Sequence, residues 1–227
     1  MNCLRICKAV AVYIALLTLC PRSGRAVDIS SDMVMGYSGG PGGQVGVNFS
    51  HFIENSGLSV RLGMGYNSTS PGDPVKAREI FVNEADGGTP ESSAHDYVWR
   101  LDFVAPQKAH PGTGWRLSGG PRYSRFVANF RYVGGNEEFD VRAHQWGLGG
   151  GADYTAPMGS NVSFRLGGGV DYFFPSMLEG HDSEYNPDNA NVGSKENFKY
   201  EDADRVINQP TVQFRAQAGL VMRLGAP

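Results

Sequence analysis

Residues 162–174 have the sequence VSFRLGGGVDYFF, in which apolar side chains alternate with polar or small ones. One face of an extended chain would carry Val162, Phe164, Leu166, Gly168, Val170, Tyr172 and Phe174. The opposite face would carry Ser163, Arg165, Gly167, Gly169 and Asp171. A repeat of two is the repeat of a β-strand whose two faces meet different surroundings. The segment therefore predicts a strand with one apolar and one polar face.

Seven further segments show the same alternation, and no segment after residue 26 approaches the eighteen consecutive apolar residues of a transmembrane helix. These segments are 33–38, 45–53, 58–66, 97–104, 115–132, 139–154 and 211–224. In 115–132 and 139–154 the pattern changes phase near Ser124 and His144, which indicates a bulge or a strand that continues beyond a membrane. Eight such runs predict an all-β fold, a closed antiparallel up-and-down transmembrane barrel of about eight strands.

The connections between these segments alternate in length. The links 54–57, 107–114 and 157–161 are short, whereas 67–96 and 176–210 are long and fall on the opposite side of the barrel. The links 41–44 and 134–138, on the side of the long ones, are tight. Outer-membrane barrels place short turns in the periplasm and longer loops outside. Within the first long link, Asp73 and Pro74 before VKAREIF predict a capped helical turn.

The type of charged residue indicates which face is inside. Lysine and glutamate occur in links, rims and turns, whereas the strands carry arginine and aspartate. A soluble lipid-carrier barrel of the lipocalin kind would also alternate, but its water-facing sheet would use lysine and glutamate freely. A narrow interior favours arginine, whose planar guanidinium pairs with carboxylates, and glycine, which makes room for it. We therefore predict a charge network in the lumen formed by Arg61, Arg100, Asp102, Arg116, Arg122, Asp140, Arg142, Asp153, Arg165, Asp171, Arg215 and Arg223. The directions of Arg125 and Arg131 stay open.

A three-residue hairpin loop at 158–160 would fix one register within this network. It would set Asp153 directly opposite Arg165 and Tyr154 opposite Phe164. A shift by two residues would keep both faces but leave the two charges diagonal.

Aromatic residues fall near the predicted strand ends. Tyr66, Trp99, Tyr172 and Phe174 lie beside the long links, and Phe103, Trp115 and Tyr154 lie near the short turns. Two such girdles are typical of a barrel that spans a bilayer, although aromatic residues also favour strands in general.

The first 26 residues have the layout of a cleavable signal peptide. Arg5 and Lys8 precede the apolar run 9–20, and small residues end the segment at 24–26. A lipoprotein signal ending at Cys20 is the alternative, but it needs a small residue where Leu19 stands. We expect export through this signal and a mature barrel domain at 27–227.

Removal of residues 1–26 changes the charge and the cysteine count. All three cysteines leave, so the mature chain has no disulfide or thiol. Sixteen cationic residues remain against 23 acidic ones, a formal charge of −7, which argues against a nucleic-acid partner.

The segments LGGGADYTAPMGSNVSFRLGGGVDYFF and VQFRAQAGLVMRL resemble the family of small eight-stranded outer-membrane barrels, the OmpA transmembrane domain, OmpX and related porin-like proteins. The resemblance is one of pattern and implies a barrel in the bacterial outer membrane. The family usually ends in an aromatic residue used in assembly, whereas this sequence ends Leu224-Gly225-Ala226-Pro227. We expect no periplasmic peptidoglycan-binding domain.

No residue pattern indicates catalysis. The histidines have no nearby serine and acidic residue in a recognisable arrangement. Asp182, Glu184, Asn186 and Asp188 alternate in one long link, and we interpret them as a solvated acidic loop before a calcium site. We expect no enzyme activity, cofactor or metal.

These observations favour a structural or surface-interaction role. An eight-stranded barrel is just wide enough to be filled by its own side chains, so we expect a plugged polar lumen. The partners would be outer-membrane lipids and an extracellular ligand or host surface that meets loops 67–96 and 176–210. The alternative function is a narrow porin-like channel for small solutes or anions.

Overall fold

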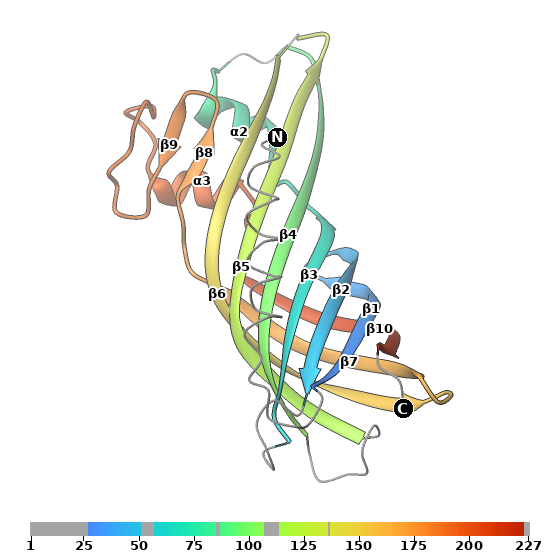
Figure 1. Cartoon of the computed structure of the whole chain (residues 1–227). Helices are drawn as coiled ribbons and strands as arrows, with labels where there is room; N and C mark the ends of the chain where they lie inside the picture. Colours follow the sequence, from blue (N-terminus) through green and yellow to red (C-terminus); the bar gives the residue numbers. More distant parts are fainter. Residues whose placement is uncertain (1–26, 51–56, 85–86, 107–113, 136, 225–227) are drawn as a thin grey trace, which may run out of the picture.

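The computed structural model describes residues 27–50, 57–84, 87–106, 114–135 and 137–224 (Figure 1). The predicted signal peptide at 1–26 lies outside the described residues, as do most of the predicted short turns at 54–57 and 107–114.

Eight antiparallel strands form a closed ring. They are β1 (Asp28–Ser38), β2 (Pro41–Ser50), β3 (Ser59–Thr69), β4 (Thr89–Pro106), β5 (Gly114–Val133), β6 (Glu137–Pro157), β7 (Val162–Phe173) and β10 (Val212–Arg223). Strands β1 to β7 pair in chain order, and β10 pairs with both β7 and β1. Every strand of the ring is therefore hydrogen-bonded to a neighbour on both sides over at least part of its length. The prediction of an all-β, closed, up-and-down barrel of eight strands is confirmed.

The outer face of the ring is apolar and the inner face is polar, which is the reverse of a water-soluble barrel. In β7, Phe164, Leu166 and Val170 are exposed, whereas Arg165 and Asp171 are buried. The other strands share this arrangement, with Met33, Val45, Met64, Trp99, Leu117, Leu148 and Leu220 exposed on the outside. A barrel with apolar side chains outside and charged side chains inside suits an apolar medium, because exposed apolar area is unfavourable in water.

Strands β4, β5 and β6 are longer than the others, at 18, 20 and 21 residues, and extend beyond the ring at one end (Figure 1). In each of β5 and β6, the alternate residues that face inward at one end of the strand continue to do so at the other end. On β5 the side chain of Arg122 and those of Phe126 and Phe130 are all on the buried side. The expected bulges near Ser124 and His144 are therefore wrong, and the alternative of a strand that continues beyond the membrane-facing part agrees with the structure.

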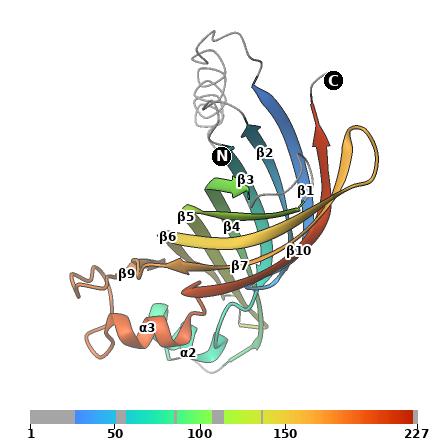
Figure 2. The same cartoon turned by 90° about the horizontal axis from the view of Figure 1, so that it is seen from below.

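The two long links fold together into one small unit, which we call the loop subdomain. It contains α2 (Pro74–Phe81), α3 (Tyr200–Val206) and the hairpin of β8 (Leu178–Gly180) and β9 (Ser183–Tyr185). Strand β8 pairs with the extended part of β6, and α2 and α3 lie side by side in both views (Figures 1 and 2). The two links also join directly, since Gly72 and Ile207 form an antiparallel bridge.

An apolar core holds the loop subdomain on the extended strands. The buried side chains of Phe126, Phe130, Phe139 and Val141 pack with Ile80, Phe81, Leu178, Tyr185, Tyr200 and Ile207. This core explains the change in sequence pattern. Above Ser124 the inner face of β5 meets the loop subdomain, so it is apolar, and the outer face carries charge.

The predicted helical turn after Asp73 is confirmed as α2. The Asp73 carboxylate accepts hydrogen bonds from the backbone N–H groups of Val75 and Lys76, and Pro74 takes the first helical position, where no N–H is needed. No helix in the described part of the chain has the length and apolar character needed to cross a membrane.

The strand boundaries differ from the prediction at both ends of the barrel, at the loop subdomain for β4 and at the short-turn end for β1. Strand β4 begins at Thr89, within the predicted loop 67–96, and β1 begins at Asp28 where the prediction began at 33. The β6–β7 register is also shifted by two residues. Asp153 lies opposite Gly167 and Tyr154 opposite Leu166, so the predicted three-residue turn is wrong.

Candidate functional site: the charge network inside the barrel

Asp171 on β7 is the centre of one cluster inside the barrel. Its carboxylate lies 2.8 Å from Arg122 Nε, 3.2 Å from Arg100 Nη2 and 3.7 Å from Arg215 Nε. These arginines come from β5, β4 and β10. Asp171 and the side chains of Arg100 and Arg122 are at most 1% exposed, so the cluster is cut off from solvent.

Asp153 on β6 is the centre of a second cluster. Its carboxylate lies 2.7 Å from Arg165 Nε, 2.9 Å from Arg61 Nη1 and 3.4 Å from Arg116 Nε. Arg165 and Asp153 are therefore in contact although they are diagonal in register. Arg165 also reaches Asp32 on β1, at 3.1 Å.

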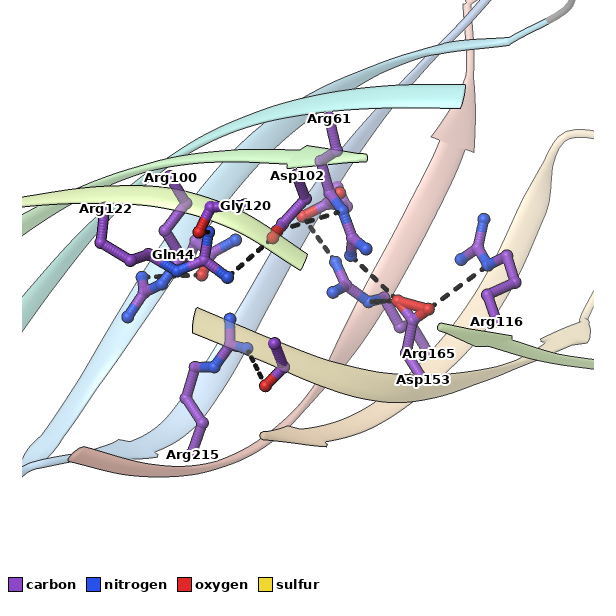
Figure 3. A network of polar contacts seen from close by, with 12 residues as sticks. Gln44, Arg61, Arg100, Asp102, Arg116, Gly120, Arg122, Asp153, Arg165 and Arg215 are labelled. Atoms are coloured by element: carbon purple, nitrogen blue, oxygen red, sulfur yellow. Dashed lines mark hydrogen bonds and ion pairs between the residues drawn. The ribbon is translucent and has the colours of Figure 1, made fainter. Parts of the chain in front are cut away.

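Asp102 joins the two clusters. It accepts a hydrogen bond of 2.7 Å from Arg122 Nη2 and lies 4.0 Å from Arg61 Nε (Figure 3). The result is one connected set of charges. Its members are Asp32, Arg61, Arg100, Asp102, Arg116, Arg122, Asp153, Arg165, Asp171 and Arg215.

Several of these contacts join strands that are not neighbours in the ring. Arg61 of β3 reaches Asp153 of β6, and Arg100 of β4 reaches Asp171 of β7. Arg100 also donates hydrogen bonds to Gln44 Oε1 at 2.9 Å and Ser38 Oγ at 3.0 Å. Such contacts have to cross the interior, so the network ties opposite walls of the barrel together (Figure 3).

Glycines on the inner face provide the space that the guanidinium groups occupy. A Cβ on Gly149 would lie 1.9 Å from Asp171 Oδ1 and 2.7 Å from Arg122 Nε. A Cβ on Gly169 would lie 2.6 Å from Arg215 Nη2, and one on Gly65 would lie 2.8 Å from Arg100 Nη1. The glycine-rich strands are therefore part of the network's geometry.

A layer of polar side chains closes the network at the end next to the loop subdomain. Asp96 on β4 accepts hydrogen bonds from Ser124 Oγ and, at 2.7 Å, from Gln213 Nε2 of β10 on the opposite wall. Asp32 and Asp96 were not predicted, because both lie outside the segments 33–38 and 97–104. Continuing each repeat of two outward by one residue would have found them.

Three predicted members are not part of the network. Asp140 and Arg142 lie on the extended part of β6 and point outward, where they pair with each other at 2.9 Å. Their placement in the lumen was wrong because the polarity of the strand's faces reverses above His144. Arg223 lies at the exposed end of β10, outside the buried set.

A separate polar contact fastens α2 to the top of β6. Arg78 Nε donates to Glu137 Oε2 at 2.6 Å, Asn83 Nδ2 donates to Glu137 Oε1 at 2.9 Å, and the Arg78 guanidinium lies 4.6 Å above the Tyr132 ring. The hydrogen bond from Arg78, followed by that from Asn83, holds the pKa of Glu137 below its ordinary value.

This lowered pKa predicts an acid-sensitive attachment of α2. Because the folded-state pKa of Glu137 is the lower one, its contribution is complete above the ordinary glutamate range and is lost as the pH falls through the folded-state value. We expect amide hydrogen exchange in α2, corrected for intrinsic rates, to accelerate as the pH falls below the ordinary range of glutamate. Glu137→Gln should abolish that pH dependence, and Glu138→Gln, on the outer face, should retain it. Unchanged acid acceleration in Glu137→Gln would contradict the prediction.

The arrangement supplies fixed ion pairs between buried guanidinium and carboxylate groups. Among the described residues, no group of three or more His, Cys, Asp or Glu side chains could hold a metal ion.

No family model matches the sequence, and no curated protein matches it. Among solved structures, a major outer membrane protein from Thermus thermophilus superposes with a TM-score of 0.71 at 22% identity, covering 88% of this chain and all of that one. Neisserial surface protein A superposes with a TM-score of 0.40 at 9% identity, covering 87% of this chain and 97% of that one. The first comparison shows that the chain has the fold of an eight-stranded outer-membrane β-barrel.

Proposed function

We propose that this chain is an integral protein of the bacterial outer membrane with a plugged polar lumen. Its role is structural or interactive, exercised through the loop subdomain at the cell surface. The signal peptide predicted at 1–26 fits export to that membrane.

The exposed apolar belt of the barrel carries the proposal. Large side chains such as Phe164, Leu166, Leu148 and Met33 are exposed on the outside of strands whose inner faces bury ion pairs. A belt of this kind around a closed ring would be costly in water and is favourable in a bilayer. Trp99 and Trp146 at one end and Trp115 at the other bracket this belt, as interfacial aromatic residues do.

The density of the network supports a closed lumen. The cavity lined by Ser118, Asp153, Arg165, Arg215 and Gln217 has a volume of about 10 Å³, which is room for about one water molecule. Contacts between opposite walls, from Arg61 to Asp153 and from Gln213 to Asp96, fill the space that a channel would need.

The loop subdomain supports a surface role of a particular kind. The predicted loops 67–96 and 176–210 are joined by an apolar core, so a ligand would meet one folded surface in place of two separate loops. Folded loops on a rigid scaffold are where binding residues are commonly found.

A narrow anion channel is the alternative function, and one observation favours it. The network contains Arg61, Arg100, Arg116, Arg122, Arg165 and Arg215 against Asp32, Asp102, Asp153 and Asp171, a surplus of positive charge. Recordings in planar bilayers separate the two functions. We expect no steady conductance, and a stable anion-selective current would establish the channel.

Fractionation of cells and cysteine labelling test the location and orientation. The chain should appear in the outer-membrane pellet. Because no cysteine follows residue 26, an impermeant maleimide should label Asp188→Cys in the loop subdomain on intact cells and spare Met158→Cys in the short turn. Recovery in the soluble periplasm would refute membrane insertion, and the reverse labelling pattern would invert the orientation.

Leu166→Arg tests which face meets lipid. Leu166 is 52% exposed near the middle of β7, and a charge near the bilayer midplane costs about 2–4 kcal/mol. We expect the free energy of unfolding in phospholipid vesicles to fall by that amount, as measured by urea titration. Leu166→Ala removes the side chain without adding charge and should cost much less. Equal losses for the two variants would mean that residue 166 does not face lipid.

A further inference from the structure

The outer faces of β4, β5 and β6 carry a row of aromatic rings at the end of the apolar belt. Trp99 lies opposite Tyr123 and Tyr123 opposite Trp146 in register, with ring centroids 5.6 Å and 5.1 Å apart. Trp146 is 64% exposed, and the next outward residues toward the short turns are apolar, Leu101 and Leu148. This row marks where the bilayer interface would lie on this side of the barrel.

Two residues beyond that row along β5, the outer face becomes cationic. Arg125 on β5 lies between Tyr97 of β4 and His144 of β6 in register, about 7 Å along the strand from Tyr123. Arg142 on β6 lies opposite Val127, which is two residues beyond Arg125 on β5. The Arg125 side chain is exposed and forms no ion pair with any described residue.

Nearby acidic groups act mainly on Arg142. Asp140 pairs with Arg142 at 2.9 Å, and Glu179 of β8 lies opposite Arg142 in register. Arg142 therefore has its charge partly neutralised, whereas Arg125 has its guanidinium turned outward immediately above the aromatic row. His144, whose Nδ1 is 2.9 Å from the Tyr123 hydroxyl, is fixed beside it.

We propose that Arg125, assisted by His144 and Arg142, binds the phosphate of an anionic membrane lipid whose acyl chains lie on Trp99, Tyr123, Trp146 and the apolar belt below. Guanidinium groups bind phosphate oxygens through two parallel hydrogen bonds. The continuous apolar surface beneath the cation favours a lipid over free phosphate, because only a lipid would cover it. The inference rests on the proposed membrane insertion.

Tryptophan fluorescence gives a direct measurement at this position. Trp99 and Trp146 flank the site, and the third tryptophan, Trp115, lies at the other end of β5. The Trp115→Phe protein would be inserted into phosphatidylcholine vesicles that contain a minor fraction of phosphatidylglycerol. Bromine would be placed on the acyl chains of either the anionic or the zwitterionic lipid. Quenching by each brominated lipid reports which one occupies the surface next to Trp99 and Trp146.

We expect the anionic lipid to be enriched about five-fold at this surface over its fraction in the vesicle, the size expected for one basic residue near a membrane surface. Arg125→Gln should remove most of that enrichment. Arg131→Gln is the matched control, because Arg131 is on the same strand and face, about 20 Å further from the aromatic row. It should leave the enrichment unchanged. Millimolar inorganic phosphate should also leave it unchanged.

The other outcomes overturn the proposal in distinguishable ways. Equal quenching by the two brominated lipids would refute headgroup binding while leaving insertion intact. The same loss in Arg125→Gln and Arg131→Gln would show a general charge effect and no site. Loss of the enrichment in phosphate would mean that the site takes the free anion. Absence of quenching by either brominated lipid would refute membrane insertion itself.

Discussion

Asp171→Asn should lower the barrel's free energy of unfolding by about 3–5 kcal/mol, the cost of leaving a buried charge without its partner. Asp171 is fully buried and is the only carboxylate within 4.0 Å of Arg100 and Arg215 among the described residues. Asparagine has nearly the same shape, so the loss would come from charge. Arg122 would keep Asp102, whereas Arg100 would keep only the neutral Gln44 and Ser38.

Urea titration of the purified protein in vesicles measures this effect, and Asp140→Asn supplies the control. Asp140 also pairs with an arginine at 2.9 Å, but that pair is exposed, and exposed pairs contribute about 0–1 kcal/mol. We therefore expect a large loss for one aspartate and a small one for the other. Similar losses would show that water reaches Asp171 and screens it, which would also weaken the argument for a plugged lumen.

The barrel could be predicted because its outer wall repeats one simple rule. Each strand has to bury charge on one side and present apolar side chains on the other, so a repeat of two appears in segments such as 162–174 and specifies both strand and face. The choice of arginine and aspartate then separated inside from outside. The eight segments expected on this basis correspond to the eight strands of the ring.

The rule fails where the surroundings of the strand change. Above Ser124 and His144 the inner face packs against the loop subdomain, so apolar residues turn inward and Asp140, Arg142 and Arg125 turn outward. The sequence contains this inversion, but only as an apparent shift of phase. Its meaning depends on the loop subdomain, whose core joins residues more than a hundred positions apart, as in the hydrogen bond from the Tyr185 hydroxyl to the Ile80 carbonyl.

Register was the other feature that the sequence did not determine. Faces are preserved by any shift of two residues, so the alternation around 148–166 is equally compatible with Asp153 opposite Arg165 or opposite Gly167. The structure has the second arrangement, and the long arginine side chain makes the contact diagonally. Gly167 makes this possible, since a Cβ there would lie 3.0 Å from Asp153 Cβ.

The pair Asp153 and Arg165 should show strong energetic coupling in spite of that diagonal register. Arg165 Nε and Asp153 Oδ1 are 2.7 Å apart, and both side chains are nearly inaccessible to solvent. Asp153→Asn and Arg165→Gln should each cost up to about 3–5 kcal/mol, because each leaves a buried charge behind. Asp153→Asn should be the more costly of the two, since it removes a partner from Arg61 and Arg116 as well.

The double variant should lose less than the sum of the single losses by about 1–3 kcal/mol, the range for residues that share one network. With both side chains neutral, Arg61 still has Asp102 at 4.0 Å, whereas Asp32 loses its partner Arg165 in the Arg165→Gln and double variants alike. A cycle of Asp96→Asn with Arg165→Gln is the control, because Asp96 bonds to Ser124 and Gln213 and shares no partner with Arg165. That cycle should be additive within about 0.5 kcal/mol. Additive losses for Asp153 and Arg165 would mean that the two charges do not meet in solution, and Asp153 would then be paired with Arg61 and Arg116 alone among the described residues.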